Sequence, residues 1–304
     1  MVSEKFLLII NPTSGWGQGK RYKEWLERES KKVCGKQIDV ICSSKSGKNS
    51  IENLVKRAIK DGYRRVIAAT GDGGCNEVVN VLAGSDVSLA IIPIGTANDF
   101  AKGINIPQNV KRAFRVAVHG KEVSIDLGRI NGRYFVNVAS FGFDAQLVRM
   151  VSELREQFSF LPSRWLYLLS FLKKINLPLE LSSIRINGGK EKRVLGLVIT
   201  NGPQYGGMFK IAPAASYTDG LLECCLIGGT NVLQVLEKFP KLLNGTHNTF
   251  PDVIMGRISS LTVSSYEELD CEVDGEFFEK QKDYIITIHP GILKVVIPQE
   301  NVIR

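Results

Sequence analysis

Short apolar runs and helix-like segments alternate along the first 126 residues of the chain. The helix-like segments repeat their apolar residues at three- and four-residue spacing, and Ser50 stands where it can cap one of them. This alternation is typical of βαβ units, which build a parallel sheet. The predicted strands are residues 6–10, 38–42, 65–70 and 89–94, and the predicted helices are residues 20–32, 51–58 and 77–83.

The pattern changes near residue 126, after which strand follows strand. Residues 127–130 and 134–138 flank Asn131-Gly132, a pair that supplies both positive-φ positions of a type I′ hairpin turn. We therefore predict an α/β fold class: an N-terminal α/β domain with a parallel sheet (residues 1–126) and a C-terminal antiparallel β-sandwich (residues 127–290). The further predicted strands are residues 193–200, 221–227, 260–264, 269–273, 284–289 and 293–297.

Residues 163–176 are apolar almost all round and are predicted to form a helix inside the second domain. The segment is too short to span a bilayer. It is either a buried helix or a helix beside a lipid entrance. In the second case Trp165 and Tyr167 would lie near lipid headgroups, and Lys173 and Lys174 near phosphates.

The 304 residues carry a net charge of +8, and residues 1–65 alone hold 15 Lys and Arg against 7 Asp and Glu. The positive excess therefore falls in this first segment. A basic surface attracts nucleic acid, anionic lipid headgroups or nucleotide phosphates. Because the acids are interleaved with the bases, a solvated helical face also explains the pattern.

Neither a zinc site nor a membrane span is indicated. The six cysteines form no CxxC pair, and the chain has three histidines. Cysteines scattered through apolar runs are typical of reduced core residues, and no signal peptide is recognisable, so we expect a cytoplasmic protein. No apolar stretch reaches the ~18 residues of a transmembrane helix.

A polar turn, Asn11-Pro12-Thr13-Ser14-Gly15, follows the first predicted strand. It offers backbone N–H groups and hydroxyls. The carboxyl ends of parallel strands form the edge at which α/β folds bind ligands. Taken alone, an ordinary strand-to-helix turn explains this segment equally well.

The third predicted strand leads into Thr70-Gly71-Asp72-Gly73-Gly74-Cys75-Asn76-Glu77. Its glycines let the backbone approach a phosphate, and the N-terminus of the following helix favours an anion. Asp72 suits this turn if it faces a phosphate-bridging Mg²⁺ or accepts a proton from an attacking hydroxyl; otherwise it is a helix cap. Asn76 excludes a dinucleotide fingerprint, and Arg21 after Gly19-Lys20 excludes a Walker A loop.

The fourth predicted strand leads into a similar turn, Pro93-Ile94-Gly95-Thr96-Ala97-Asn98-Asp99-Phe100. Two such turns on neighbouring strands can grip one polyphosphate from both sides, with Asp99 near the metal. The alternative is two unrelated turns.

Two acidic turns lie in the second domain. In Asp270-Cys271-Glu272-Val273-Asp274-Gly275-Glu276, a partly desolvated Glu276 would be a general base for a hydroxyl, although a surface hairpin is an alternative. In Ser216-Tyr217-Thr218-Asp219-Gly220-Leu221, the Asp219 carboxylate and nearby carbonyls can hold a hard cation, or form a simple Asp-Gly turn.

In its motifs Asn-Pro-x-Ser-Gly, Gly-Asp-Gly-x-x-Asn-Glu and Gly-Thr-x-Asn-Asp-Phe, the chain resembles the diacylglycerol kinase catalytic family. That family includes bacterial lipid kinases, sphingosine kinases and ceramide kinase. Asp144, the Asp219-Gly220 turn and Val273-Asp274-Gly275-Glu276 extend the resemblance over nearly the whole chain. It implies ATP in a cleft between an α/β domain and a β-sandwich, with residues 291–304 completing the first domain.

The resemblance also implies roles for single residues. Asp72, Asp99 and Glu276 are implied as catalytic, and Asp144 as a contact of the lipid. Ser216, Asp219 and Leu221 are implied as a structural Mg²⁺ site. The implied nucleotide-binding residues are Asn11, Pro12, Thr13, Ser14, Gly15, Ser43, Gly71, Gly73, Gly74, Asn76, Glu77, Gly95, Thr96 and Asn98.

Two positions depart from the family pattern. The family usually reads Gly-Gly-Asp-Gly-Thr where this chain has Thr70-Gly71-Asp72-Gly73-Gly74, so the hydroxyl expected at position 74 is absent. Thr70 is not an obvious substitute. A threonine that the family carries after the second strand matches Ser43 or Cys42 only loosely. We expect a weaker or altered grip on one phosphate.

The predicted function is transfer of the γ-phosphate of ATP, with Mg²⁺, to the hydroxyl of a membrane lipid, diacylglycerol or a related one. A kinase of a soluble acceptor is an alternative, because NAD kinases share a Gly-Gly-Asp-Gly turn. A nucleotide- or lipid-binding protein with weakened catalysis is another. We expect peripheral contact with the inner face of the membrane, no nucleic-acid partner, and sheet edges that permit a homodimer.

Overall fold

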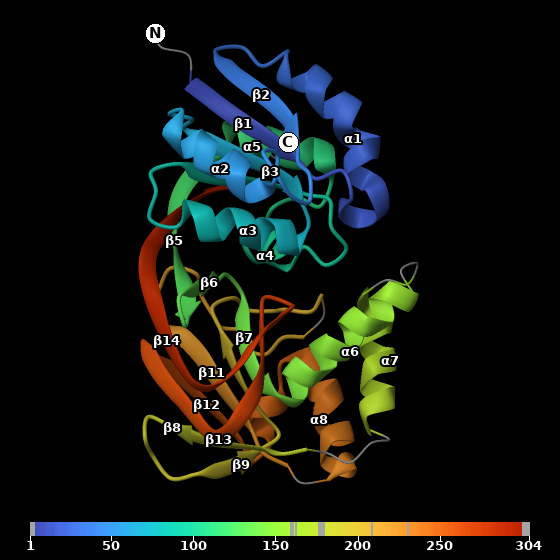
Figure 1. The fold of residues 1–304 in the computed structure, drawn as a ribbon, viewed down its shortest axis with the longest axis vertical. Coiled ribbons are helices and arrows are strands. Elements are labelled where there is room, and N and C mark those ends of the chain that lie inside the picture. The colour runs from blue at the N-terminus through green and yellow to red at the C-terminus, as the bar shows by residue number, and fades with distance from the viewer. Residues whose placement is uncertain are drawn as a thin grey trace. The chain divides into compact units, whose positions relative to one another are not determined.

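The structure is a computed structural model. It describes residues 4–158, 161, 163–175, 180–207, 209–229 and 231–299. Contacts divide the chain into two compact units: Met1–Ile125 with Gly291–Arg304, and Asp126–Pro290. Strands β5 (Lys121–Ile130) and β14 (Glu276–Ile297) contribute residues to both units (Figure 1).

The first unit contains a parallel sheet with the strand order β14-β4-β3-β1-β2. β3 and β4 are buried along their whole length, as expected for central strands that are covered on both faces. The polar turns predicted from the sequence follow the carboxyl ends of β1, β3 and β4. The bounds are β1 (Glu4–Ile10), β2 (Lys36–Cys42), β3 (Arg65–Thr70) and β4 (Ser88–Pro93).

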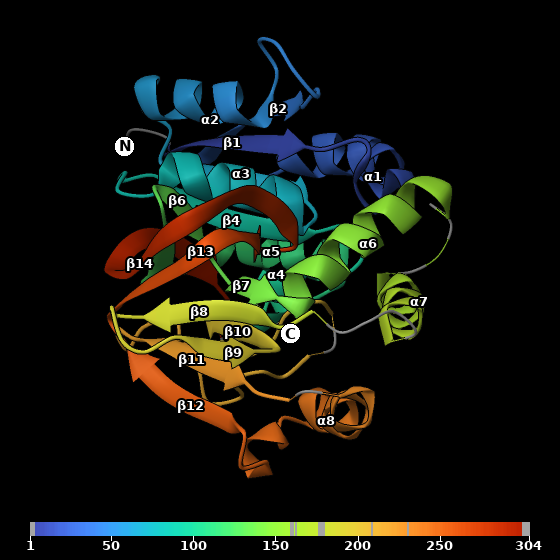
Figure 2. The same cartoon turned by 60° about the horizontal axis from the view of Figure 1, so that its bottom comes forward.

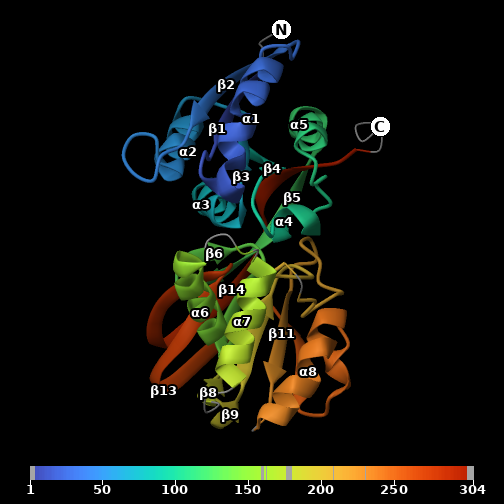
Figure 3. The ribbon, with the colours of Figure 1, turned by 90° about the vertical axis from the view of Figure 1, so that its right-hand side faces the viewer.

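Helices cover both faces of this sheet. α1 and α5 pack on one face, where the rings of Trp25 and Phe114 meet edge to face at 5.7 Å. α2 and α3 pack together on the other face (Figure 3). The bounds are α1 (Ser14–Ser30), α2 (Ile51–Lys60), α3 (Asp72–Leu82), α4 (Asp99–Gly103) and α5 (Val110–His119).

Helix α2 begins where the sequence predicted, whereas helix α3 begins earlier. α2 begins as predicted, because the Ser50 hydroxyl accepts the backbone N–H of Asn53 at 3.3 Å. α3 begins at Asp72, earlier than the predicted residue 77. The glycine turn itself winds into the first helical turn, in which the N–H of Cys75 donates to the carbonyl of Gly71 at 3.0 Å.

The second unit is the predicted antiparallel β-sandwich. Its strands follow the order β12-β11-β10-β7-β13-β14, each antiparallel to its neighbours. β8 pairs with β13 and with β9, and β5 pairs with β6 through the predicted Asn131-Gly132 turn. The bounds are β6 (Arg133–Phe135), β7 (Val138–Gly142), β8 (Ser182–Ile186), β9 (Lys192–Val194), β10 (Gly196–Thr200), β11 (Leu222–Ile227), β12 (Val253–Ile258) and β13 (Ser260–Val273).

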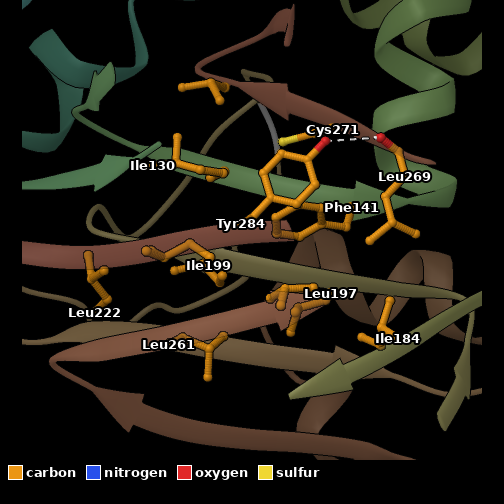
Figure 4. Close-up of a cluster of buried hydrophobic side chains, with 14 of the residues drawn as sticks. Ile130, Phe141, Ile184, Leu197, Ile199, Leu222, Leu261, Leu269, Cys271 and Tyr284 are labelled. Atoms are coloured by element: carbon orange, nitrogen blue, oxygen red, sulfur yellow. Dashed lines mark hydrogen bonds between the residues drawn. The ribbon is translucent and has the colours of Figure 1, made fainter. Parts of the chain in front are cut away.

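A cluster of buried apolar side chains fills the sandwich (Figure 4). Phe141 of β7 meets Tyr284 of β14 edge to face, with ring centroids 4.8 Å apart. The Tyr284 hydroxyl donates to the carbonyl of Leu269 at 3.1 Å, so its polar end is satisfied inside the core. Alternate residues of β7 and β10 point into this cluster, as the period of a strand requires.

The opposite face of β7, β10, β11 and β12 packs against three helices, which Figure 2 shows on one side of the strands. α7 (Ser163–Ile175) was predicted, and Asn176 lies outside the described residues. α6 (Phe143–Gln157) and α8 (Val232–Asn244) were not predicted; α8 contains Pro240, which interrupts the helical signal. A short 3₁₀ turn follows at His247–Thr249. None of the described helices is long and apolar enough to cross a membrane.

The predicted strand at residues 134–138 is split into β6 and β7. The backbone N–H groups of Val136, Asn137 and Val138 all donate to the Asp274 carboxylate, at 2.7–2.9 Å. Because these groups bind a side chain, they are lost to strand pairing.

Candidate functional site

The turn after β1 lies tightly against the ends of β3 and β4. The N–H of Asn11 donates to the carbonyl of Ala69 at 2.9 Å. Gly15 has a φ of +55°, and a Cβ there would lie 1.7 Å from the carbonyl oxygen of Ile94, so only glycine fits. This turn contains five of the predicted nucleotide contacts: Asn11, Pro12, Thr13, Ser14 and Gly15.

The turns after β3 and β4 meet through two glycines. A Cβ on Gly71 would lie 3.0 Å from the Cα of Gly95, and a Cβ on Gly95 would lie 2.5 Å from the Cα of Gly71. The two backbones therefore touch with no side chain between them. This contact brings the second and third turns to one place at the sheet edge.

Asn98 fixes the shape of the third turn. Its backbone is left-handed, with a φ of +53°, and its side chain closes on Gly95 through two bonds. Oδ1 accepts the N–H of Gly95 at 2.9 Å, and Nδ2 donates to its carbonyl at 3.0 Å. Thr96, inside the closed turn, is exposed.

Asp72 joins the second turn to the third. Its Oδ2 accepts the N–H of Asn98 at 2.7 Å, and its Oδ1 accepts the N–H of Asp99 at 2.8 Å. Burial raises the pKa of Asp72 above its ordinary value, against the lowering effect of these backbone bonds. The two aspartates predicted to share a site are thus brought together.

The remaining predicted contacts lie around this edge. Ser43 follows β2, and its N–H donates to the carbonyl of Ile10 at 2.9 Å, so Ser43 lies beside the first turn. Gly73 and Gly74 belong to the first turn of α3, whose N–H groups have no partner within the helix. Asn76 is buried and its Oδ1 accepts a hydrogen bond from Asn80 Nδ2 at 2.6 Å, while Glu77 is exposed.

In the acidic turn of the second unit, residues 270–276, Asp274 and Glu276 bind different partners. Asp274, with a φ of +50°, is committed to the three N–H groups between β6 and β7, and burial raises its pKa to about 6. Glu276 opens β14, is exposed, and pairs with Arg133 at 2.5 Å. The sequence predicted a partly desolvated Glu276, and in the structure its side chain is 47% exposed. Because Glu276 belongs to the second unit, its approach to the glycine turns stays a prediction.

Asp144 belongs to a buried cluster that the sequence did not predict. The Ser140 hydroxyl lies 2.6 Å from Asp144 Oδ2 and 3.0 Å from Glu272 Oε1, and Tyr205 also bonds to Asp144. A hydroxyl carries one proton, so Ser140 can donate to only one carboxylate. The other contact requires a proton on a carboxyl group.

The pKa values of this cluster agree with a shared proton. Burial raises the pKa of Asp144, and burial together with the charge of Asp144 raises the pKa of Glu272 well above its ordinary value. Burial raises the pKa of Tyr205 as well, so this phenol keeps its proton. The one signal in the sequence was a glutamate between Cys271 and Val273, inside an apolar strand.

A small apolar pocket of about 60 Å³ lies within the second unit, and Asp144 and Tyr205 are among its lining residues. Its walls are aliphatic and aromatic side chains of α6, α7, α8, β10 and β11 and of the segment around Phe209. Lys238 also lines it, but its ammonium group is neutralised by Asp252 at 2.6 Å. The pocket therefore has an apolar lining that includes the polar groups of Asp144 and Tyr205, a composition that suits an amphiphilic molecule.

The predicted metal ligands Ser216, Asp219 and Leu221 do not form an open set of donors. The Asp219 carboxylate pairs with the guanidinium of Arg257, and its Oδ1 accepts the N–H of Leu221 at 3.1 Å. The Ser216 hydroxyl turns to Thr218, 3.3 Å away. As they stand, these residues do not fit a Mg²⁺ ion, because a protein cation already neutralises the carboxylate.

The first unit is thus an α/β domain with glycine-rich turns at the carboxyl edge of its parallel sheet, and the second is a β-sandwich with a small apolar pocket. Comparison with known families agrees with this pair of domains. The model of the diacylglycerol kinase catalytic domain matches residues 5–130, and that of the YegS C-terminal NAD kinase beta sandwich-like domain matches residues 137–297. The chain belongs to the diacylglycerol kinase family and is a kinase.

Individual relatives agree. A protein named diacylglycerol kinase from Staphylococcus aureus strain MRSA252 is 30% identical over 278 residues, covering 89% of this chain and 85% of the relative. One of the same name from strain JH9 is 29% identical over 284 residues, with the same coverage. A crystal structure described as a diacylglycerol kinase from Bacillus anthracis strain Sterne matches with a TM-score of 0.74 at 22% identity, covering 98% of both chains. At that identity it shows a shared fold.

Proposed function

We propose that this kinase transfers the γ-phosphate of ATP to the hydroxyl of a membrane lipid, diacylglycerol or a related one. The observation that carries the proposal is the apolar pocket with Asp144 and Tyr205 in its lining. Burial of an apolar tail would drive binding, and the two polar groups would orient the headgroup. The names of the Staphylococcus aureus relatives point to the same class of acceptor.

The nucleotide belongs, in this proposal, at the carboxyl edge of the parallel sheet. Because Gly71 and Gly95 carry no side chains, the backbone of the two turns can come close to phosphate oxygens. The N-terminus of α3 adds its positive end. Thr96 is the exposed hydroxyl of the third turn.

Asp72 and Asp99 fit a magnesium ion bound with ATP. Mg²⁺ in such sites takes one or two carboxylates and completes its shell with phosphates and water. The absence of a three-residue metal cluster among the described residues is therefore compatible with it. When bound, the ion neutralises charge that develops on the phosphates. Asp72, committed to two N–H groups, holds the turns in the geometry that this requires.

Transfer forms a bond between the acceptor oxygen and the γ-phosphorus and breaks the bond to the β–γ bridging oxygen, so that ADP leaves. The hydroxyl proton must pass to a base. Asp72 is a candidate because its carboxylate lies at the glycine turns where the phosphates would bind. Glu276 is the other, and its pairing with Arg133 would have to open.

Contact with a membrane surface is part of the proposal. On α7 the side chains of Trp165, Leu169 and Leu172 are 48%, 43% and 45% exposed, and Lys173 lies beside them. Apolar side chains edged by lysine suit an anionic lipid surface. The basic residues 1–65 can add about 1 kcal/mol each near such a surface. We propose a cytoplasmic protein that binds the inner face of the membrane peripherally.

The test is incubation with labelled ATP and Mg²⁺ in three arms: a total lipid extract, vesicles containing diacylglycerol, and NAD without lipid. We expect labelled phosphatidic acid in the vesicle arm and none of the label on NAD. Label on NAD would instead support a soluble acceptor. Tight ATP binding with no labelled product in any arm would support a binding protein whose catalysis has weakened. Either result refutes the proposal.

A further inference from the structure

The side chain of Thr70 fills the space beside Gly74. Thr70 is the last residue of β3 and is 3% exposed. A Cβ built on Gly74 would lie 2.1 Å from Thr70 Oγ1, 3.2 Å from Thr70 Cβ and 3.1 Å from Ile51 Cδ1. Real Cβ atoms do not approach other atoms within 3.0 Å. With the Thr70 hydroxyl in this position, position 74 therefore has no room for a side chain.

The hydroxyl that occupies this space belongs to a small polar group at the sheet edge. Thr70 Oγ1 lies 3.3 Å from Ser14 Oγ, and Ser14 Oγ accepts the N–H of Gly71 at 3.3 Å. Two hydroxyls carry two O–H donors, and their mutual bond uses one of them. The second O–H is left to donate to an oxygen outside the pair.

The surroundings favour an anionic oxygen for that bond. The pair lies between the turn after β1 and the first turn of α3, whose N–H groups present a partial positive charge. It also stands where the sequence departs from its family, which reads glycine at the position of Thr70 and threonine at that of Gly74. Threonine at position 70 in place of threonine at position 74 moves the hydroxyl from helix α3 to strand β3, but leaves it in nearly the same place.

We propose that Thr70, together with Ser14, donates a hydrogen bond to a phosphate oxygen of the bound nucleoside triphosphate. Gly74 is the residue that makes room for it. The inference rests on the proposed nucleotide site, but it concerns only the binding of phosphate and not the identity of the acceptor. In this proposal the Thr70 hydroxyl replaces the one absent at position 74, so that ATP binding is not weakened.

The test is a reciprocal exchange measured by calorimetric binding of Mg-ATP without any lipid. Thr70→Val keeps the volume and removes the hydroxyl, so we expect about tenfold weaker binding, the loss typical of one hydrogen bond to a charged group. Thr70→Ser keeps the hydroxyl and should bind within about threefold of wild type. Thermal melting of both variants separates a lost contact from a lost fold.

A second test exchanges the side chains at positions 70 and 74 and measures ATP affinity and melting temperature. Gly74→Thr alone places a side chain against Thr70, so both ATP affinity and melting temperature should fall. Combining it with Thr70→Gly removes the clash and should restore both. A Thr70→Val variant that binds as wild type does, or a double variant no better than Gly74→Thr alone, overturns the inference. Failure of the wild type to bind Mg-ATP would instead refute the proposed function itself.

Discussion

The Asp72 carboxylate and the backbone N–H of Asp99 lie 2.8 Å apart, and the same carboxylate accepts the N–H of Asn98 at 2.7 Å. One side chain at the start of α3 thus fixes the backbone that follows β4. The same carboxylate therefore supplies charge to the site and holds the backbone of the turn after β4. A change at Asp72 should alter the chemistry of the edge and the position of its third turn together.

Replacement of Asp72 by asparagine tests this coupling. The amide has one acceptor oxygen, and its NH₂ group would face the second backbone N–H. We expect a loss of about 1–3 kcal/mol in the free energy of unfolding, because a buried N–H loses its acceptor. Phosphoryl transfer should fall by about 10²-fold or more if Asp72 serves as the base or orients the ion. Urea unfolding and labelled-ATP turnover measure the two effects.

Asp86→Asn is the matched control, since its side chain is fully exposed and pairs with Lys294 at the surface. That variant should unfold and react as the wild type does. Full activity of Asp72→Asn would remove Asp72 from the site.

The order of elements in the first unit could be predicted because the spacing of apolar residues distinguishes its strands from its helices. The three polar turns follow for the same reason, since each stands directly after an apolar strand. The start of α3 could not be placed, because glycines carry little helical signal.

In the second unit, contacts between residues far apart in the chain could not be predicted from the sequence. Glu272 and Asp144 are separated by 128 positions and meet only because β13 pairs with β7. The same holds for Asp219 and Arg257, brought together by β11 and β12. A carboxylate in a turn suggests a metal ligand, yet the sequence near Asp219 does not indicate that an arginine from another strand will pair with it.

Gly15 and Gly17 form a matched pair for the first turn. Both have left-handed backbones, with φ of +55° and +82°, but a Cβ would meet the Ile94 carbonyl at position 15 and nothing within 4 Å at position 17. Gly17→Ala should cost about 1 kcal/mol for its backbone alone. Gly15→Ala adds a clash with backbone and should cost at least about 2 kcal/mol more, with weaker ATP binding. Equal costs in urea unfolding would contradict the close approach of this turn to β4.

Filling the apolar pocket should separate the two substrates of the reaction. Val235 on α8 is buried in the pocket wall, so Val235→Phe narrows the space for an apolar tail. We expect the KM for diacylglycerol vesicles to rise by about tenfold or more, while the KM for ATP stays within about twofold. Leu233→Phe is the control on the same helix, because Leu233 is 71% exposed. An unchanged lipid KM in Val235→Phe, with the melting temperature preserved, would show that the acceptor binds elsewhere.

The buried carboxyl pair predicts a pH dependence of stability. The pKa of Glu272 is raised in the folded protein above its ordinary value of 4.5, so folding favours the protonated form. The stability from this group is present below the unfolded pKa and is lost as pH rises through the folded pKa. Glu272→Gln keeps an oxygen for the N–H of Gly275 and an NH₂ donor for Ser140, without a charge. Relative to wild type, the variant should therefore gain free energy of unfolding as pH rises above 4.5, the ordinary pKa of the group. Exposed Glu267→Gln should leave the wild-type profile unchanged, and a parallel profile for Glu272→Gln would mean that the pair shares no proton.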